Sequence, residues 1–127
     1  MLQDDAIEHM TLEKLETYER LSAKYMEDAQ ALLEKGDTVQ AGEKLWGSVA
    51  EAVKATATKR SVNLRTHADI WNFILRLDRE YPRKEFYTLF TIADHLHSNF
   101  YEDELPSEAV TKALSKLKEL TVKLKEL

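Results

Sequence analysis

The sequence has no cysteine and very little glycine or proline. Its 127 residues include 0 Cys, 3 Gly and 2 Pro. The absence of cysteine excludes disulfides, thiol catalysis and thiolate zinc sites, and so few glycines and prolines leave little material for the turns of an all-β fold. No apolar run approaches the roughly 18 residues of a membrane span, and the opening MLQDDAIEHM lacks the basic lead and apolar stretch of a signal peptide. We therefore expect a cytoplasmic protein that does not associate with membranes.

The composition is that of a globular chain. Hydrophobic residues make up 43% and charged residues 32%, which excludes a disordered protein. A chain of this length forms one domain with a core of its own. We expect a single domain over residues 1–127, in which about the first ten residues are a candidate disordered segment.

Positive charge gathers in the middle of the chain. Between Lys54 and Lys84 there are eight basic residues against three acidic ones, a net of +5, and the chain as a whole has a net charge of −5. A phosphate-bearing partner would favour this segment. The alternative is that these arginines and lysines only complement the negative ends of helix dipoles.

Apolar spacings of three and four predict about five helices. The first is predicted to begin at a Thr11 cap and to end at Gly36, and Asp37 and Gln40 predict the capping box of a second helix over about 38–58. That helix is rich in small residues, and Trp46 adds bulk on its core face. Thr66 predicts the start of a third helix that ends near Tyr81-Pro82. A fourth helix extends into LHSNFYE, a fifth opens near Ser107, and no strand pattern is seen. The fold class is therefore all-α, an antiparallel up-and-down bundle.

Three strings of the chain resemble a known family. The segments GDTVQAGEKLWGSVAEAVKATA, THADIWNFILRL and LHSNFYEDEL are similar to the archaeal PaREP paralogue family, which is placed among HEPN-type (higher eukaryote and prokaryote nucleotide-binding) domains. The resemblance covers about residues 20–110. It implies an antiparallel helical bundle that forms homodimers and binds nucleotides or RNA. It also implies a role in a toxin–antitoxin or stress-response pair with a nucleotidyltransferase-type protein partner.

Ribonucleases of the HEPN class carry an arginine followed, after four to six residues, by a histidine. Arg60 and His67 satisfy this spacing, and Arg65 is a near neighbour of His67. A histidine with a pKa near 6.5 is suited to general acid–base catalysis, and an arginine would stabilise the charged transition state. However, this pair lies earlier in the chain than the class places its motif. We therefore keep Arg60 and His67 as candidate catalytic residues and do not expect an active enzyme.

The end of the fourth helix carries a second group of candidate residues. His97 and Tyr101 are four residues apart and share a helix face, while His95 points almost the opposite way. The two histidines therefore cannot chelate one metal ion, and neither a metal nor a cofactor is expected. The candidate ligand-binding residues are His97, Asn99, Tyr101 and Arg65. The alternative is a polar network that closes the helix end and fixes its packing.

Two functions from different classes remain open. The first is a HEPN-like nucleotide- or RNA-binding protein. The second is a non-catalytic helical dimerisation or interaction module. The positions of Arg60, Arg65, His67 and His97 distinguish between them, because a binding site requires these side chains to converge on an accessible surface.

Overall fold

The computed structural model describes the backbone of residues 2–102 and 105–127, and within these ranges the side chains of all residues except 2–7 and Tyr101. Its α-helices are α1 (Leu2–Glu34), α2 (Thr38–Lys59), α3 (His67–Glu80), α4 (Phe86–Glu102) and α5 (Ser107–Lys125). A short 3-10 turn, η1 (Pro82–Lys84), separates α3 from α4. The described chain contains no strand, so the predicted all-α bundle is confirmed.

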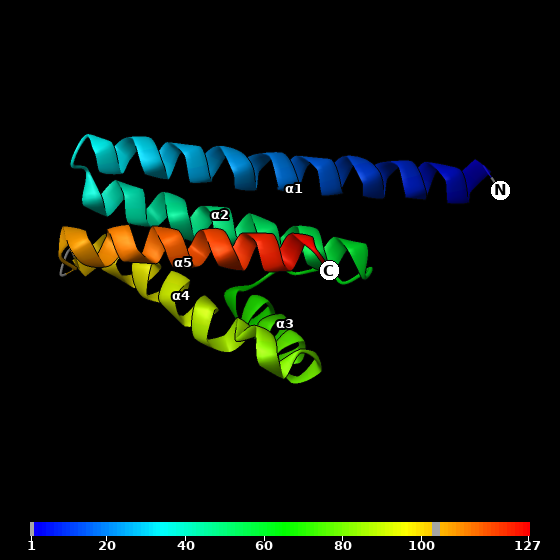
Figure 1. Ribbon diagram of the computed structural model, residues 1–127. Coiled ribbons are helices and arrows are strands. Elements are labelled where there is room, and N and C mark those ends of the chain that lie inside the picture. The colour runs from blue at the N-terminus through cyan, green and yellow to red at the C-terminus, as the bar shows by residue number, and fades with distance from the viewer. Residues whose placement is uncertain (1, 103–104) are drawn as a thin grey trace.

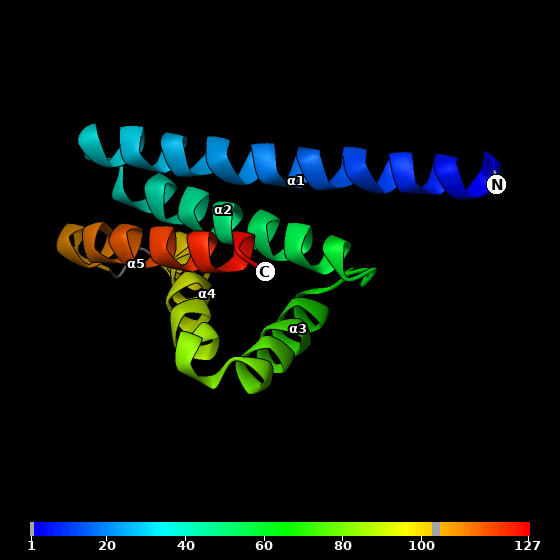
Figure 2. The same cartoon turned by 45° about the vertical axis from the view of Figure 1, so that its right-hand side comes forward.

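The helices form two groups. Helices α1, α2 and α5 run nearly side by side, whereas α3 and α4 form an oblique V joined at η1 (Figures 1 and 2). Helix α2 is central: it packs against α1, α3, α4 and α5. Its small residues explain this position, because buried alanines and a buried glycine allow several helices to pack closely against α2. No helix in the described ranges is both long and apolar enough to cross a membrane.

Several predicted helix boundaries are confirmed. Gly36 adopts φ 83° in the turn after α1, and the Asp37 side chain accepts a hydrogen bond from the backbone N–H of Gln40 at the start of α2. Thr66 and Asp69 form a complete capping box on α3. These local signals are strong because each satisfies backbone groups that a helix end leaves unpaired.

The predicted start of α1 is wrong. The helix begins at Leu2 and not at Thr11, so residues 2–10 form its first turns. The residues before Thr11 include no proline or glycine, and most of them are good helix formers, so nothing interrupts the helix. As Figure 1 shows, α1 therefore extends beyond the ends of α2 and α5.

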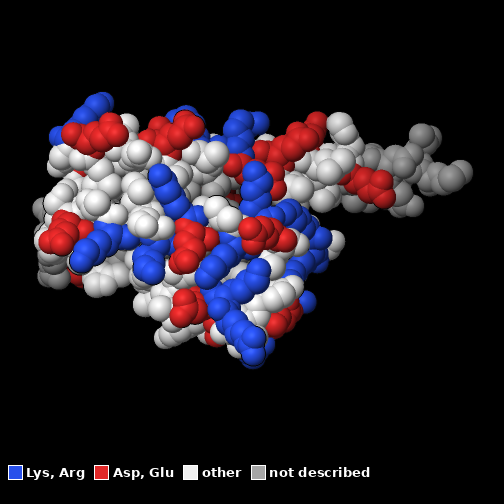
Figure 3. Space-filling model, in the orientation of Figure 1, with Lys and Arg blue, Asp and Glu red and all other residues white. Residues whose placement is uncertain are grey.

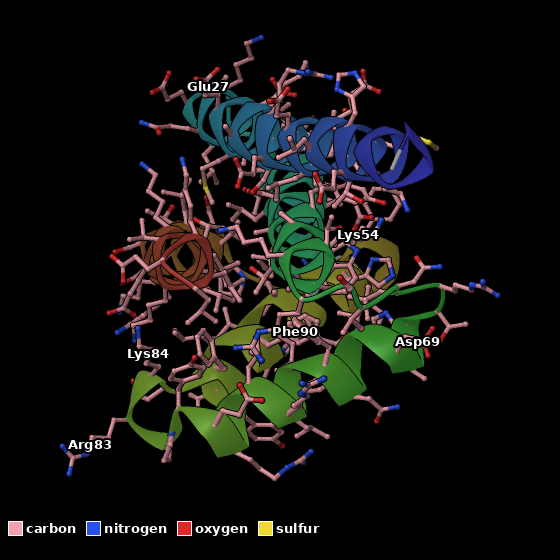
Figure 4. The ribbon with its side chains drawn as sticks, turned by 90° about the vertical axis from the view of Figure 1, so that its right-hand side faces the viewer. Glu27, Lys54, Asp69, Arg83, Lys84 and Phe90 are labelled. Atoms are coloured by element: carbon pink, nitrogen blue, oxygen red, sulfur yellow. The ribbon has the colours of Figure 1, made fainter. Side chains whose placement is uncertain are left out.

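An aromatic core lies between α2, α3 and α4. Phe90 of α4 is fully buried, and Figure 4 shows it between the ribbons of the bundle. Its ring lies 4.7 Å from that of Trp71, edge-on, and 5.7 Å from that of Trp46. Edge-to-face packing of this kind stabilises a core beyond the area that it buries. This core positions the start of α3 and the end of α4 next to α2.

Candidate functional site

Two histidines from different helices meet over one tryptophan. The rings of His67 and His97 have centroids 6.0 Å apart. Trp46 lies under both, 4.7 Å from the ring of His97 in a stacked arrangement and 5.2 Å from that of His67. Trp46 is only 9% exposed, so it is a buried floor and the imidazoles are the accessible groups.

Each imidazole has a carboxylate partner. His67 Nε2 lies 2.9 Å from Asp94 Oδ1, and His97 Nδ1 lies 3.2 Å from Glu43 Oε2. The four side chains are between 30% and 45% exposed, so solvent and small ligands reach them. We call His67, His97, Asp94, Glu43 and Trp46 the histidine cluster.

Local helix geometry explains why these residues share a site. Glu43 and Trp46 are three residues apart on α2, and Asp94 and His97 are three apart on α4, so each pair lies on one face of its helix. His67 is the first residue of α3, and the capping box of Thr66 fixes the direction in which that helix starts. The cluster therefore depends on three helices and one cap.

The basic residues do not all join this cluster. Arg60 Nη1 donates to Glu80 Oε2 at 2.7 Å, and Arg60 Nη2 donates to the hydroxyl of Tyr81 at 3.4 Å. Both partners are at the C-terminal end of α3, whereas His67 is at its N-terminal end, roughly 20 Å away at 1.5 Å per residue. The structure thus separates Arg60 from His67 and leaves no arginine–histidine pair of the ribonuclease kind between them.

The salt bridge of Arg60 also shifts two pKa values. The hydrogen bond from Arg60, followed by a smaller contribution from Arg76, lowers the pKa of Glu80 below its ordinary value. The same contact raises the pKa of Arg60. Arg60 is therefore held as a structural cation that ties the end of α2 to the end of α3.

Arg65 is close in sequence to the histidine cluster and remains exposed. Its backbone N–H donates to Asp69 Oδ2 at 2.9 Å, which holds the residues before α3 in place. Hydrogen bonds from the backbone N–H groups of Arg65 and Thr66 lower the pKa of Asp69. Arg65 is thus the arginine that the fold leaves near His67.

Basic residues of the central segment lie near both ends of α3. Arg65 precedes its start, and Arg83 and Lys84 follow its end. Figure 4 shows Asp69, near the start of α3, on the opposite side of the molecule from Arg83 and Lys84. Figure 3 shows lysines and arginines interspersed with acidic residues over α5 and the region below it. There Lys123 Nζ donates to the carbonyl oxygen of Lys84 at 2.9 Å. Such residues at helix ends complement the backbone dipole, which is the alternative considered from the sequence.

The other two candidate residues have different positions. Asn99 is only 2% exposed, and its Oδ1 accepts a hydrogen bond from the backbone N–H of Leu105 at 2.8 Å. It therefore joins the end of α4 to the segment before α5, as the polar-network alternative predicts. The side chain of Tyr101 lies outside the described residues.

Three members of the cluster were not singled out as site residues by the sequence. Trp46 was assigned to the core, Asp94 was recognised as lying one turn before His97 but was not selected, and Glu43 was not considered. The signal that identifies them is the spacing of three residues, which places Glu43 with Trp46 and Asp94 with His97. Among the described side chains, no group of three or more His, Asp or Glu residues is arranged to hold a metal ion.

Comparison with known proteins identifies a matching family. The model of a family described as the archaeal PaREP1/PaREP8 family matches residues 17–121. No curated protein and no solved structure matches the chain. The matched range contains every residue of the histidine cluster and excludes most of the part of α1 that extends beyond the bundle.

Proposed function

Because the chain belongs to the archaeal PaREP1/PaREP8 family and carries an accessible histidine cluster, we propose that it is a HEPN-like protein that binds RNA or a nucleotide. The observation that carries the proposal is the convergence of His67 and His97, from α3 and α4, over Trp46. In the cell such binding would serve a toxin–antitoxin or stress-response pair with a nucleotidyltransferase-type partner.

The chemistry of the cluster is suited to the edge of a nucleobase. A carboxylate oxygen accepts hydrogen bonds from the amino groups of cytosine, adenine or guanine, and an imidazole both donates and accepts. Protein sites for single-stranded RNA also stack unpaired bases on histidine rings. Asp94 and Glu43 supply the acceptors here, and the exposed faces of His67 and His97 supply the planar surface.

The phosphate of the same nucleotide belongs outside the cluster. Two carboxylates repel a phosphate group, whereas the exposed guanidinium of Arg65 attracts it and forms two parallel hydrogen bonds with its oxygens. Arg65 precedes His67 by two residues. A base that stacks on the histidine rings would therefore place its phosphate near the segment before α3. The proposal does not include RNA cleavage, because Arg60 is held by Glu80.

Binding of a fluorescein-labelled single-stranded RNA, measured by fluorescence anisotropy at low salt, tests this function. AMP and GMP serve as competitors. We expect His97→Ala and His67→Ala each to weaken binding about tenfold, since a hydrogen bond in such a site is worth about 1.4 kcal/mol. Arg65→Ala should weaken it and make it less sensitive to salt.

His95→Ala is the matched control. His95 is exposed and lies two residues from His97 on α4, so it faces away from the cluster, and its loss should leave the affinity within about twofold. Circular dichroism confirms that each variant is folded. Failure of the unmodified protein to bind RNA, AMP or GMP overturns the proposal, and so does equal binding by all the variants.

The second candidate function is a helical interaction module without a ligand. It is favoured by an open groove on the other side of α2, between α1 and α5. Under this alternative the histidine cluster only joins α2, α3 and α4 through its two hydrogen bonds. The anisotropy experiment separates the two functions, because a module of this kind does not distinguish His97→Ala from His95→Ala.

A further inference from the structure

A second group of aromatic side chains reaches the surface of the same two helices that carry the histidines. Tyr87 of α4 is 49% exposed, and its ring lies 5.9 Å from that of Trp71 of α3, which is partly buried. Leu75, one turn after Trp71, is also exposed. Adjoining exposed apolar side chains are typical of a binding surface. We call Trp71 and Tyr87 the aromatic pair.

The seam between α3 and α4 connects the aromatic pair to the histidine cluster. On α3, Trp71 follows His67 by four residues, or one turn. On α4, Tyr87 precedes Asp94 by seven residues, or two turns. Each helix therefore presents both groups along one stripe. The groups are separated by about 6 Å along α3 and about 10 Å along α4, at 1.5 Å per residue.

One buried ring supports both groups. The ring of Phe90, which Figure 4 shows between the ribbons, lies 5.7 Å from Trp46 and 4.7 Å from Trp71. Trp46 lies under His97, and Trp71 contacts Tyr87. A continuous row of five rings thus runs from His97 through the core to Tyr87, and both of its ends are accessible. Rings that are held in this way lose little freedom when a ligand stacks on them.

Basic residues stand at both ends of a row on α3. Arg65 precedes His67, and Arg79 follows Trp71 by eight residues, on the same ridge of residues spaced four apart. Arg79 is exposed. None of the residues three or four positions away from it is acidic, so no partner along the helix offsets its charge. The row therefore has the order cation, ring, ring, cation.

Two acidic residues lie close to the aromatic pair. Asp78 Oδ1 accepts a hydrogen bond from the backbone N–H of Tyr87 at 3.1 Å, which fixes the start of α4. Glu85 is exposed in the turn before that helix. Because carboxylates repel phosphate, the pair is suited to the flat face of a base, and the phosphates belong near the arginines.

The spacing of the two groups indicates the form of the ligand. Successive bases of a helical strand are roughly 3.4 Å apart, which is less than the separation of the cluster and the pair. Two neighbouring bases that occupy both groups must therefore be unstacked from each other. Proteins that bind single-stranded RNA hold unstacked bases on aromatic side chains in this way. A mononucleotide has one base and occupies only one of the groups.

We propose that the ligand is single-stranded RNA, in which one base occupies the histidine cluster and the next packs on the aromatic pair. Tyr87 supplies the stacking ring, Trp71 holds that ring in position, and Arg79 faces the phosphate that follows. This inference rests on the proposed function, because the pair adjoins a base only when the cluster holds one. It adds that a mononucleotide is an incomplete ligand.

Competition against the labelled RNA, measured by fluorescence anisotropy, tests the second base. The competitors are AMP, the dinucleotide pApA, and pApA that lacks its second base but keeps the sugar and phosphate. We expect pApA to compete at about a tenfold lower concentration than AMP, the effect of one base stacked on an aromatic side chain. The abasic analogue should compete like AMP, since it gains no stacking.

Variants of Tyr87 locate the effect. Tyr87→Ala should weaken the binding of pApA about tenfold and leave that of AMP within about twofold, whereas Tyr87→Phe keeps the ring and should retain both affinities. Thr88→Ala is the matched control. Thr88 is exposed on α4 and is turned about 100° away from Tyr87, so its loss should change neither affinity. Circular dichroism confirms that each variant is folded.

The two tryptophans report separately on the two groups. The chain contains only Trp46 and Trp71, so Trp46→Phe leaves Trp71 as the sole tryptophan. Its fluorescence should change on addition of pApA and not on addition of AMP. The complementary variant, Trp71→Phe, should respond to both ligands through Trp46.

The outcomes distinguish this inference from the proposed function. If pApA binds no more tightly than its abasic analogue, or if Tyr87→Ala weakens AMP and pApA equally, the second base site is overturned and the histidine cluster remains a nucleotide site. A Trp71 signal that responds equally to AMP and pApA also overturns it. If the unmodified protein binds none of these ligands, both proposals are overturned.

Discussion

The two sides of α2 are packed in different ways. Toward α3 and α4 it presents Trp46, which contacts the fully buried ring of Phe90. Toward α1 it presents Gly47 and Ser48, and the only buried residues among the described side chains of α1 are Ser22, which is 8% exposed, and the fully buried Ala29. Large apolar side chains thus fix one side, whereas close backbone approach and hydrogen bonds fix the other.

Hydrogen bonds replace apolar area on the α1 side. Ser22 Oγ donates to the carbonyl oxygen of Ser48 at 2.8 Å, and Ser48 Oγ donates to that of Ser22 at 2.7 Å. This reciprocal pair fixes the position of α1 along α2 and requires few bulky residues. The difference teaches that α1 contributes little to the apolar core, because close approach and polar contacts fix its position along α2.

Replacement of Phe90 by alanine should have the largest effect, because it removes a fully buried ring from the aromatic side. We expect a loss of about 3–5 kcal/mol in the free energy of unfolding, measured by urea denaturation. The matched change on the other side is Met26→Ala at the groove edge, which should cost about 1 kcal/mol or less because this side chain is only partly buried. Similar costs for the two variants would remove the contrast between the two sides.

Replacing each of the two glycines inside α2 by alanine tests the same two sides of this helix with one added methyl group. A Cβ at Gly42 would meet only Leu96, with Cδ2 at 3.6 Å and Cβ at 3.9 Å, in ordinary contacts. Gly42→Ala should therefore stabilise the protein by up to about 1 kcal/mol through helix propensity. A Cβ at Gly47 would lie 3.2 Å from Tyr25 Cδ2 of α1, so the Tyr25 ring must shift and the gain must be smaller. Thermal denaturation should rank Gly42→Ala above Gly47→Ala, and the reverse order would show that α1 is the more adaptable neighbour.

The smallest effect is expected from Asp69→Asn at the start of α3. Hydrogen bonds from the backbone N–H groups of Arg65 and Thr66 lower the pKa of Asp69 below its ordinary value. A carboxylate with a lowered pKa stabilises the folded state above its unfolded pKa, and this contribution is lost as the pH falls through the folded value. The melting temperature of the unmodified protein should thus exceed that of Asp69→Asn at neutral pH, and the difference should shrink below about pH 3.8.

Glu119→Gln controls for the loss of one negative charge, because Glu119 is exposed on α5. It should show no comparable change with pH. A difference between Asp69→Asn and the unmodified protein that stayed constant down to the lowest pH would contradict a role for the ionised capping box.

Local signals in the sequence predicted most of the fold. Gly36, Asp37 and Thr66 mark helix ends because each side chain or φ angle satisfies a nearby backbone group, and the structure confirms all three. The start of α1 was misplaced because Thr11 is compatible with both a cap and a helix interior. In the absence of a breaker before it, helix propensity carries the helix back to Leu2.

Only part of the candidate site could be predicted from the sequence. His97 was selected from its own helix, and His67 was selected from a ribonuclease-like spacing with Arg60. Their meeting over Trp46 depends on how α3 and α4 cross α2, and crossing geometry is set by packing rather than by local pattern. The same geometry places Arg60 at the other end of α3, which no spacing in the chain reveals.

The single turn at Gly36 has a mechanical consequence for the far end of α1. Helix α1 contains 33 residues and is therefore about 50 Å long, so a tilt of about 5° at this turn moves its far end by about 4 Å. Small adjustments where Tyr25 meets Gly47 thus become displacements as wide as a side chain at residue 2. The position of the first turns of α1 should accordingly be set by packing near Gly47, tens of ångströms away along the helix.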